Sequence, residues 1–234
     1  MLGYEVDPAL LRPLVPSGVE LDTDDDRHFV SVVAFRFLDA RLFGVPVPFH
    51  RDFDEINLRF YARRRIDQTL RRGVVFIKEI VPLRALASVA RIAYGERYVA
   101  RPMRHMSGLG GETPASDAPE GLVEHSWRER SDWHRVRATA ARAAEAPEAG
   151  SHEEFITEHY WGYTARRNGG TVEYRVSHPR WNVRRAEEAA LECDVAAVYG
   201  REFAAPLAAA PASAFVADGS TVAVHRPTAM RPRR

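Results

Sequence analysis

The sequence predicts an α+β fold that is mainly antiparallel β, arranged as a sheet or barrel with a few peripheral helices. Most hydrophobic segments are short, rich in Val, Ile and Phe, and bounded by turn residues, which is typical of strands. Two turn sequences, Asn168-Gly169 and Asp218-Gly219, are strong hairpin signals. The long alternation of strands and helices that marks a parallel sheet is absent.

The composition fits one globular domain over residues 1–234. With 45% hydrophobic and 10% aromatic residues, the chain can bury a substantial core. Its net charge of +1 favours neither nucleic acid nor anionic lipid, and no apolar run approaches the roughly 20 residues of a membrane helix. The N-terminus lacks signal-peptide features, and the single cysteine, Cys193, fits a reducing compartment. We therefore expect a cytoplasmic protein without membrane or nucleic-acid partners.

The N-terminal half alternates predicted strands with two helices. Asp7 is a typical N-cap and Pro8 fits the first helical turn, and near residue 95 a glycine stops the second helix after apolar residues at helical spacing. In chain order we predict a helix over 8–14, a strand over 28–38, a strand from Phe53 that ends at Arg63-Arg64-Arg65, a strand over 74–81 and a helix over 83–94.

The C-terminal half is predicted to hold further strands and two loops. We expect one strand over 124–140, a hairpin formed by 155–165 and 171–176, a helical stretch over 194–207, and a closing hairpin formed by 214–216 and 221–225. The segments 107–120 and 141–152 are rich in small, polar and turn-forming residues. We expect both segments to be mobile loops.

The strand that follows residue 53 is the most informative segment. Its residues alternate, so one face is apolar and the other carries Glu55, Asn57, Arg59 and Tyr61 in a row. Such a row is either a solvated face or the wall of a polar pocket. In a pocket, Arg59 would bind a carboxylate through its guanidinium fork and Glu55 would act as a general acid or base. Asn57 and Tyr61 would supply hydrogen bonds.

Lys78 is the only lysine in the chain and therefore the only side-chain amine that could form a Schiff base. Its neighbours at period two are apolar. Burial among them would lower its pKa and make it nucleophilic. The alternative is a lysine that extends its amine to solvent or pairs with Glu55 or Glu79. The sequence around Lys78 is compatible with both interpretations.

Glu158 and Tyr160 are a second pair of candidate ligand-binding residues. They lie two apart in a predicted strand and so share a face, with Tyr174 across the hairpin. The alternative is a cross-strand surface ladder. The nine histidines show no metal-ligand spacing, and no phosphate loop, dinucleotide fingerprint or nucleophile elbow is present. We therefore expect no metal and no cofactor.

Several segments in combination resemble the DUF2071 (YqjF-like) family. They are Asp7-Pro8-Ala9-Leu10-Leu11, Pro16-Ser17-Gly18-Val19-Glu20-Leu21-Asp22, Phe53-Asp54-Glu55-Ile56-Asn57-Leu58-Arg59, Arg72-Gly73-Val74-Val75-Phe76, Thr157-Glu158-His159-Tyr160 and His178-Pro179-Arg180-Trp181. The resemblance implies an acetoacetate-decarboxylase-like fold, which is a closed β-structure with a polar internal cavity. It therefore favours the pocket-wall interpretation of the Glu55 row.

The resemblance also limits the chemistry. Decarboxylases of this fold use a pair of adjacent lysines, one of which forms the Schiff base. The matching place here resembles Ala93-Tyr94-Gly95 followed by Glu96-Arg97, which contains no lysine. A Schiff-base acetoacetate decarboxylase of the usual kind is therefore not expected, and only Lys78 could take the role.

Three functional hypotheses follow. The first is a small-molecule-binding barrel whose ligand is a small oxo acid or another anion. The second is a lyase- or hydrolase-type enzyme that uses Glu55 and Arg59, with Lys78 as a further candidate. The third is a structural or interaction domain whose polar strand faces water. A small-molecule ligand is the expected partner, and the sequence is also compatible with a homo-oligomer.

Overall fold

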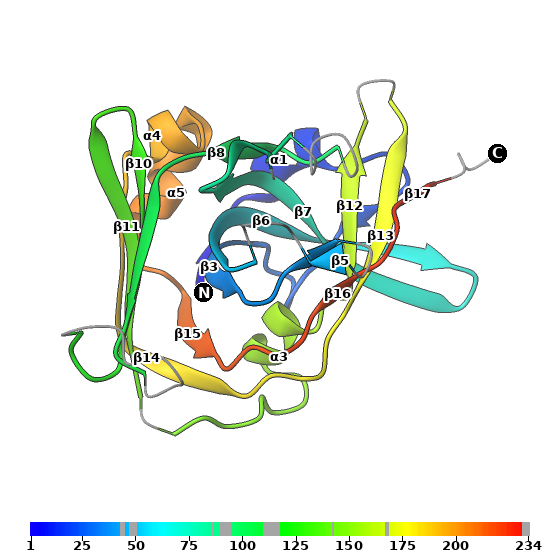
Figure 1. Cartoon of the computed structure of the whole chain (residues 1–234). Coiled ribbons are helices and arrows are strands. Elements are labelled where there is room, and N and C mark those ends of the chain that lie inside the picture. Colours follow the sequence, from blue (N-terminus) through cyan, green and yellow to red (C-terminus); the bar gives the residue numbers. More distant parts are fainter. Residues whose placement is uncertain are drawn as a thin grey trace.

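The computed structural model describes residues 1–42, 45–46, 51–85, 87–88, 95–109, 118–141, 143–166 and 169–230 (Figure 1). Most strands join one large curved sheet. Its path runs through β16 (Ala223–Val224), β13 (Thr171–Ser177), β12 (Trp161–Ala165), β7 (Thr69–Val81), β6 (Phe53–Ile66), β3 (Phe29–Phe37), β1 (Leu2–Glu5), β15 (Ser213–Ala217), β14 (Val183–Glu192), β11 (Asp132–Ala140), β10 (Leu122–Glu129) and β9 (Met103–Ser107). Three short strands pair beside this path: β17 (Thr228–Ala229), β2 (Glu20–Leu21) and β8 (Tyr98–Ala100).

The predicted fold class is confirmed, since nearly all of these pairings are antiparallel. Within the described residues, only the β7–β12 and β7–β8 pairs are parallel. The terminal strands of the path, β16 and β9, do not pair with each other, so the sheet curves without closing into a barrel. β4 (Arg41–Leu42) and β5 (Val45–Pro46) form a separate small ribbon.

The helices whose full bounds lie within the described residues are short and peripheral. They are α1 (Pro8–Leu11), which continues as a 3₁₀ turn over Arg12–Leu14, then α3 (His152–Thr157), α4 (Val195–Val198), a 3₁₀ turn over Arg201–Phe203, and α5 (Ala204–Ala208). The predicted cap of the first helix is present, because Asp7 accepts a hydrogen bond from the Ala9 amide. No helix in the described part of the chain is long and apolar enough to cross a membrane.

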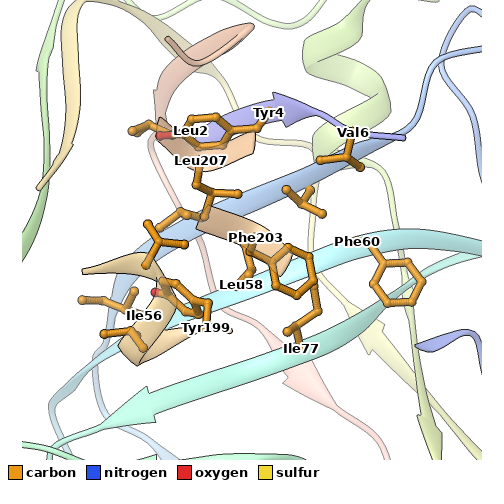
Figure 2. Close-up of a cluster of buried hydrophobic side chains, with 14 of the residues drawn as sticks. Leu2, Tyr4, Val6, Ile56, Leu58, Phe60, Ile77, Tyr199, Phe203 and Leu207 are labelled. Carbon is orange, nitrogen blue, oxygen red and sulfur yellow. The ribbon is translucent and has the colours of Figure 1, made fainter. Parts of the chain in front are cut away.

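The long hairpin β6–β7 separates two layers of buried side chains. On one face, the apolar residues of β6 pack against β1 and against the helical segment 195–208 (Figure 2). Ile56, Leu58 and Phe60 are fully buried in this core, as the alternation predicts. The other face carries a smaller apolar cluster, in which Tyr61 packs with side chains of α3 and β15. It also carries the polar side chains described below.

The predicted end of β6 is wrong. The three consecutive arginines lie inside the strand, which continues to Ile66 and turns at Asp67 with a positive φ of 53°. Arg64 can occupy the strand because it pairs with Glu173 at 2.8 Å. β7 begins correspondingly earlier than predicted, at Thr69.

The segment 124–140 forms two strands rather than one. β10 and β11 form a hairpin that turns at Arg130, whose φ is 56°. The turn contains neither Gly nor Pro, so it lacks the usual sequence signal. β8, β9 and β14 were not predicted. β14 carries Arg, Glu and Ala over most of its length, a composition that is typical of helices.

The two predicted hairpins of the C-terminal half have different outcomes. The pairing of β12 with β13 is confirmed. The predicted strand 155–165 begins too early, since Ser151 caps α3 and residues 152–157 are helical. The closing hairpin is also wrong. β15 pairs with β1 and β14, whereas β16 pairs with β13.

Two further predictions fall partly outside the described residues. Residues 84, 85, 87 and 88 are helical, but 86 and 89–94 of the predicted helix 83–94 are not described. The predicted loop 107–120 includes 110–117, and the predicted loop 141–152 includes 142, which are likewise outside the described residues.

Candidate functional site: a buried cluster of carboxyl groups

The polar face of β6 and β7 carries two glutamates and an amide. Glu55 and Asn57 come from β6, and Glu79 lies opposite Asn57 on β7, so all three share one face. The exposed fractions of these residues are 3%, 2% and 1%. Asn57 donates a hydrogen bond from Nδ2 to Oε1 of Glu55 at 3.1 Å. Glu55 and Asn57 are therefore buried and do not belong to a solvated face.

A third glutamate completes the cluster from the segment that precedes β8. Glu96 is 4% exposed, and its Oε1 accepts hydrogen bonds from Thr164 and, at 2.9 Å, from the hydroxyl of Tyr174. Tyr98 lies beside Glu79 in the β7–β8 pairing and donates to Oε2 of Glu55 at 3.1 Å. We call Glu55, Asn57, Glu79, Glu96, Tyr98 and Tyr174 the carboxyl cluster.

The carboxyl groups of this cluster are hard to ionise. Burial raises the pKa of Glu55 to about 7, although the hydrogen bonds from Asn57 and Tyr98 pull it down. Burial likewise raises the pKa of Glu96 to about 7 against the hydrogen bonds from Thr164 and Tyr174. The pKa of Glu79 is raised well above its usual value, first by burial and then by the charges of Glu96 and Glu55. Near neutral pH, these buried carboxyl groups are therefore partly protonated.

Two acceptor atoms in the cluster retain unused hydrogen-bonding capacity. Among the described residues, Oδ1 of Asn57 and Oε2 of Glu79 have no hydrogen-bond partner, although both atoms are buried. Buried polar atoms of this kind are rare in folded proteins and need an explanation. A bound ligand or water that donates hydrogen bonds would satisfy both.

A small cavity lies beside the cluster. A cavity of about 30 Å³ adjoins Glu96 and is also lined by Phe76 and Thr164, which leaves room for about one water molecule. A larger surface hollow of about 370 Å³ lies elsewhere, next to α1. It is lined by Pro8, Arg12, Val15, Glu20, Leu21 and His28, none of which belongs to the cluster.

Arg59 and Tyr61 continue the same face of β6 but have other partners. The Tyr61 hydroxyl lies 2.6 Å from Oγ of Ser31, and the Arg59 guanidinium lies 5.7 Å from the Tyr61 ring centre. Arg59 donates to the carbonyl oxygen of Ile156 at 3.3 Å. Its positive charge still lowers the pKa of Glu55, so it acts on the carboxyl cluster without a direct bond.

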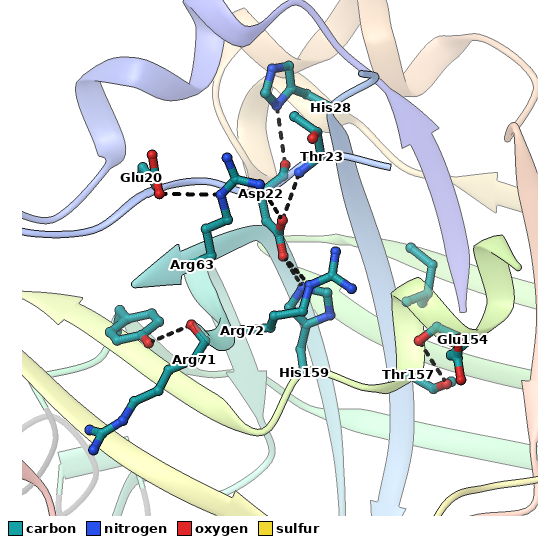
Figure 3. Close-up of polar contacts among 12 residues, drawn as sticks. Glu20, Asp22, Thr23, His28, Arg63, Arg71, Arg72, Glu154, Thr157 and His159 are labelled. Carbon is teal, nitrogen blue, oxygen red and sulfur yellow. Dashed lines mark hydrogen bonds and ion pairs between the residues drawn. The ribbon is translucent and has the colours of Figure 1, made fainter. Parts of the chain in front are cut away.

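Beyond Tyr61, a second buried polar group surrounds Asp22 (Figure 3). Oδ2 of Asp22 accepts from Nε of Arg72 at 2.6 Å and lies 3.1 Å from Nε2 of His159. Oδ1 lies 3.6 Å from Arg63. These contacts hold the pKa of Asp22 well below its ordinary value although burial pushes it upward. The His159 ring packs 4.8 Å from that of Tyr61.

Glu158 and Tyr160 do not join the carboxyl cluster. Glu158 is the C-terminal cap of α3 and not a strand residue, because the chain is helical up to Thr157. The Tyr160 hydroxyl donates to Oε2 of Glu158 at 2.6 Å. Arg180 lies 3.8 Å from the same carboxylate, and His178 packs against the Tyr160 ring at 4.8 Å. These contacts place the pair in a separate group of polar and aromatic side chains.

Lys78 is placed on the face of β7 opposite to Glu55. It pairs with Leu58 and donates from Nζ to the carbonyl oxygen of Val198. The register of β6 and β7 shifts between Leu58 and Arg59, where β7 contains one extra residue, Ile77. Burial lowers the pKa of Lys78. The structure therefore separates Lys78 from the Glu55 row, with which the enzyme hypothesis had combined it.

This placement predicts the outcome of a Schiff-base trapping experiment. Incubation with 2- and 3-oxo acids followed by borohydride reduction should leave the intact mass unchanged, because Nζ of Lys78 faces the opposite layer. The mass of the Lys78→Arg variant, treated in parallel, serves as the baseline. An adduct that maps to Lys78 would contradict the placement of this amine.

Of the cluster residues, only Glu55 and Asn57 were singled out from the sequence as site residues, and Tyr174 was named only as the neighbour of Glu158 and Tyr160 across the hairpin. Glu96, Tyr98 and Tyr174 reach the site through pairings between distant segments. Glu79 was considered only as an ion-pair partner of Lys78, and its position within a hydrophobic strand was the available signal.

Within the described residues, no group of three His, Cys, Asp or Glu side chains is placed to hold a metal ion.

Comparison with solved structures defines the class of the fold. The acetoacetate decarboxylase of Legionella pneumophila superposes with a TM-score of 0.58 at 14% identity, over 86% of this chain and 74% of that one. An acetoacetate decarboxylase-like enzyme from Sphingomonas wittichii RW1 gives 0.60 at 16% identity, over 99% and 90%. The enduracididine biosynthesis enzyme MppR, complexed with pyruvate, gives 0.57 at 13% identity, over 97% and 82%. The chain therefore has the acetoacetate-decarboxylase-like fold.

Sequence comparison gives the family. Residues 1–221 match DUF2071, which is described as an uncharacterized conserved protein, and the chain belongs to this family. It is 28% identical over 188 residues to the uncharacterized protein YqjF of Bacillus subtilis (strain 168). That alignment covers 79% of this chain and 71% of YqjF. The resemblance seen in the sequence motifs is thereby confirmed.

Proposed function

We propose that the carboxyl cluster binds a small oxo acid and exchanges protons with it. The observation that carries this proposal is the burial of three glutamates in one cluster, beside two buried acceptor atoms that have no hydrogen-bond partner among the described residues. The pKa values of Glu55 and Glu96 are raised to about 7, and that of Glu79 is raised well above its usual value. A neutral carboxyl donates a hydrogen bond and an ionised one accepts a proton, so one group serves both roles.

One positive charge near the cluster favours an acid as the ligand. Arg59 lies within electrostatic range of Glu55, and it could attract the carboxylate of an oxo acid. The ketone oxygen would then accept a hydrogen bond from a protonated glutamate. Support also comes from the similar fold of MppR, which was solved with pyruvate, an acid of this class.

Ligand binding is tested by thermal unfolding with a panel of 2- and 3-oxo acids at pH 6.5. A ligand at 100 times its Kd should stabilise the native state by about 2.7 kcal/mol, which raises Tm by about 5 to 10 °C for a chain of this size. Glu55→Gln should abolish the shift, whereas Glu158→Gln should leave it unchanged because Glu158 lies in another group. If no acid raises Tm at 10 mM, the domain has a structural or interaction role instead.

The buried carboxyls also predict a link between binding and protonation. A bound anion would raise the pKa values of the glutamates further, so protons should be taken up from solution. Calorimetric titration in two buffers that differ in ionisation enthalpy measures this uptake directly. Equal binding enthalpies in both buffers would contradict participation of the glutamates.

The raised pKa of Glu55 favours general acid–base catalysis as a second candidate function of the same site. A carboxylate with a pKa near 7 is a suitable base for removing a proton from the carbon next to a ketone. We expect the protein to accelerate the exchange of the pyruvate methyl protons with deuterated water, as followed by NMR. Glu55→Gln should remove the acceleration. Ligand binding without exchange would leave a binding protein rather than an enzyme.

A further inference from the structure

A chain of three hydrogen-bonding side chains lies outside the carboxyl cluster. Oδ2 of Asp24 is 2.6 Å from Nδ1 of His152, and Nε2 of the same imidazole is 2.9 Å from Oγ of Ser213. An acid at one ring nitrogen and a hydroxyl at the other is the arrangement that activates a serine nucleophile. It is recognised by geometry and not by sequence spacing. We propose that Ser213 is an activated nucleophile that accepts acyl groups from small esters.

Each member is held by a different element. Asp24 closes a tight turn through its backbone contact with Arg27. His152 is the first residue of α3, and Ser213 is the first residue of β15. The imidazole packs against the Phe29 ring at a centroid distance of 4.5 Å, which fixes its orientation. The base is therefore positioned by both its acid and its apolar contact.

The surroundings of Ser213 leave room for the hydroxyl. A Cβ built on Gly3 of the neighbouring strand would lie 2.5 Å from Oγ of Ser213, so the glycine lets the hydroxyl keep its present position. The side chains of His152 and Asp24 are 20% and 16% exposed, and Ser213 is half-buried. The group is thus close enough to solvent for a small substrate, while the acid is partly shielded from water.

The proposed reaction balances through the imidazole. Oγ of Ser213 forms a bond to the acyl carbon while its proton passes to Nε2 of His152. The bond between the acyl carbon and the ester oxygen breaks, and the leaving alcohol takes the proton from Nε2. Water then attacks the acyl-serine, gives a proton to Nε2 and releases the acid. Oγ recovers this proton as its bond to the acyl carbon breaks.

The alternative is a structural clasp that fastens α3 to the Asp24 turn and to β15. A fluorophosphonate probe separates the two interpretations, because it forms a phosphorus–oxygen bond only with an activated serine and releases fluoride. We expect one probe per chain, with the modified residue identified as Ser213 by peptide mapping of the wild-type protein. Mapping the wild type avoids dependence on a variant that fails to fold.

Substitutions of His152 and Asp24 test the role of each residue in activating Ser213. His152→Gln should abolish labelling, and Asp24→Asn should slow it by a factor on the order of 10³ to 10⁴. A matched control exists in Ser177, whose Oγ lies 2.9 Å from Nε2 of His225. Among the described residues, no carboxylate contacts that imidazole, so Ser177→Ala should leave labelling unchanged. Glu55→Gln should also leave it unchanged, which keeps this proposal independent of the carboxyl cluster.

Hydrolysis of a carboxylic ester provides a second test of the activated serine. Hydrolysis of p-nitrophenyl acetate should show a burst of about one equivalent of p-nitrophenol followed by a slower steady rate. Absence of probe labelling in the folded wild-type protein would overturn the proposal, as would labelling that maps to any other serine. In either case the three side chains form the structural clasp.

Discussion

Replacing Asp22 with Ala is expected to lower the free energy of unfolding by about 3 kcal/mol. The Asp22 side chain is completely shielded from solvent, and its carboxylate is shared by Arg72, His159 and Arg63. Its loss leaves these partners without their buried acceptor. This loss of stability is at the lower end of the range for removing one partner of a buried ion pair. The Arg72 and Arg63 side chains are 37% and 34% exposed, so water can partly replace the carboxylate.

Urea-induced unfolding at pH 7 measures this effect, and thermal unfolding should show Tm lower by about 6 to 12 °C. Glu20→Ala is a matched control, since Glu20 pairs with the same Arg63 at 3.4 Å but has a side chain that is 57% exposed. An exposed pair of this kind contributes about 0 to 1 kcal/mol. Equal losses in the two variants would contradict the importance of the buried contacts.

Asp22 also contributes to the pH dependence of the stability of the folded protein. Because the pKa of Asp22 is held low in the folded protein, the unfolded chain takes up its proton first as the pH falls below about 4. The stabilisation by Asp22 is therefore present above that pH and is lost as the pH falls further toward its folded pKa. The difference in stability between the wild type and Asp22→Ala should narrow accordingly.

The polar face of β6 was predictable because alternation is a local property. Side chains of a strand point to alternate faces whatever the tertiary contacts, so the row from Glu55 to Tyr61 followed from the sequence. Whether that row is buried is decided by distant elements. The covering residues Glu96 and Tyr174 belong to segments that lie far from β6 along the chain. The residues alone therefore left both interpretations open.

The position of Lys78 shows how one backbone irregularity changes a prediction. Strict alternation groups Lys78 with Phe76, which lies opposite Arg59 on the polar face. The extra residue Ile77 shifts the register, so that Lys78 turns to the core face and Glu79 joins the carboxyl cluster. A bulge depends on the match between two paired strands and leaves no consistent mark in either sequence.

The hairpin errors have a related physical origin. Asp218-Gly219 is a favourable turn, and Gly219 does adopt a positive φ of 74°. The strands on either side nevertheless pair elsewhere, because β15 fills the gap between β1 and β14. Turn chemistry therefore located the change of direction correctly. The partner of each strand depended on the rest of the sheet.

The second large effect is expected in the carboxyl cluster, where Glu79→Gln should stabilise the protein above pH 7. The pKa values of all three glutamates are raised in the folded state, so folding favours their protonated forms. Between pH 4.5 and pH 7 the native state binds more protons than the unfolded chain. The stability of the wild type must therefore fall as the pH rises through this range and beyond.

The amide that replaces the Glu79 carboxyl cannot ionise, so folding of the variant above pH 7 no longer requires a proton to be taken up at this position. After burial, the charges of Glu96 and Glu55 are the interactions that oppose the ionisation of Glu79. The gain should be about 1 to 4 kcal/mol at pH 8, the range found when buried charged groups are replaced by neutral ones of similar size. At pH 5 the difference should be small, because Glu79 is already protonated in the folded wild type.

Urea unfolding at intervals from pH 5 to pH 8.5 tests the prediction. The wild type should lose stability steadily over this range, and Glu79→Gln should lose less. Glu188→Gln provides the control, because Glu188 is exposed on β14 and its replacement should shift stability by no more than about 0.5 kcal/mol at any pH. A wild-type stability that is constant from pH 5 to pH 8.5 would show that the glutamates ionise freely. In that case the proton exchange proposed for this site would lose its physical basis.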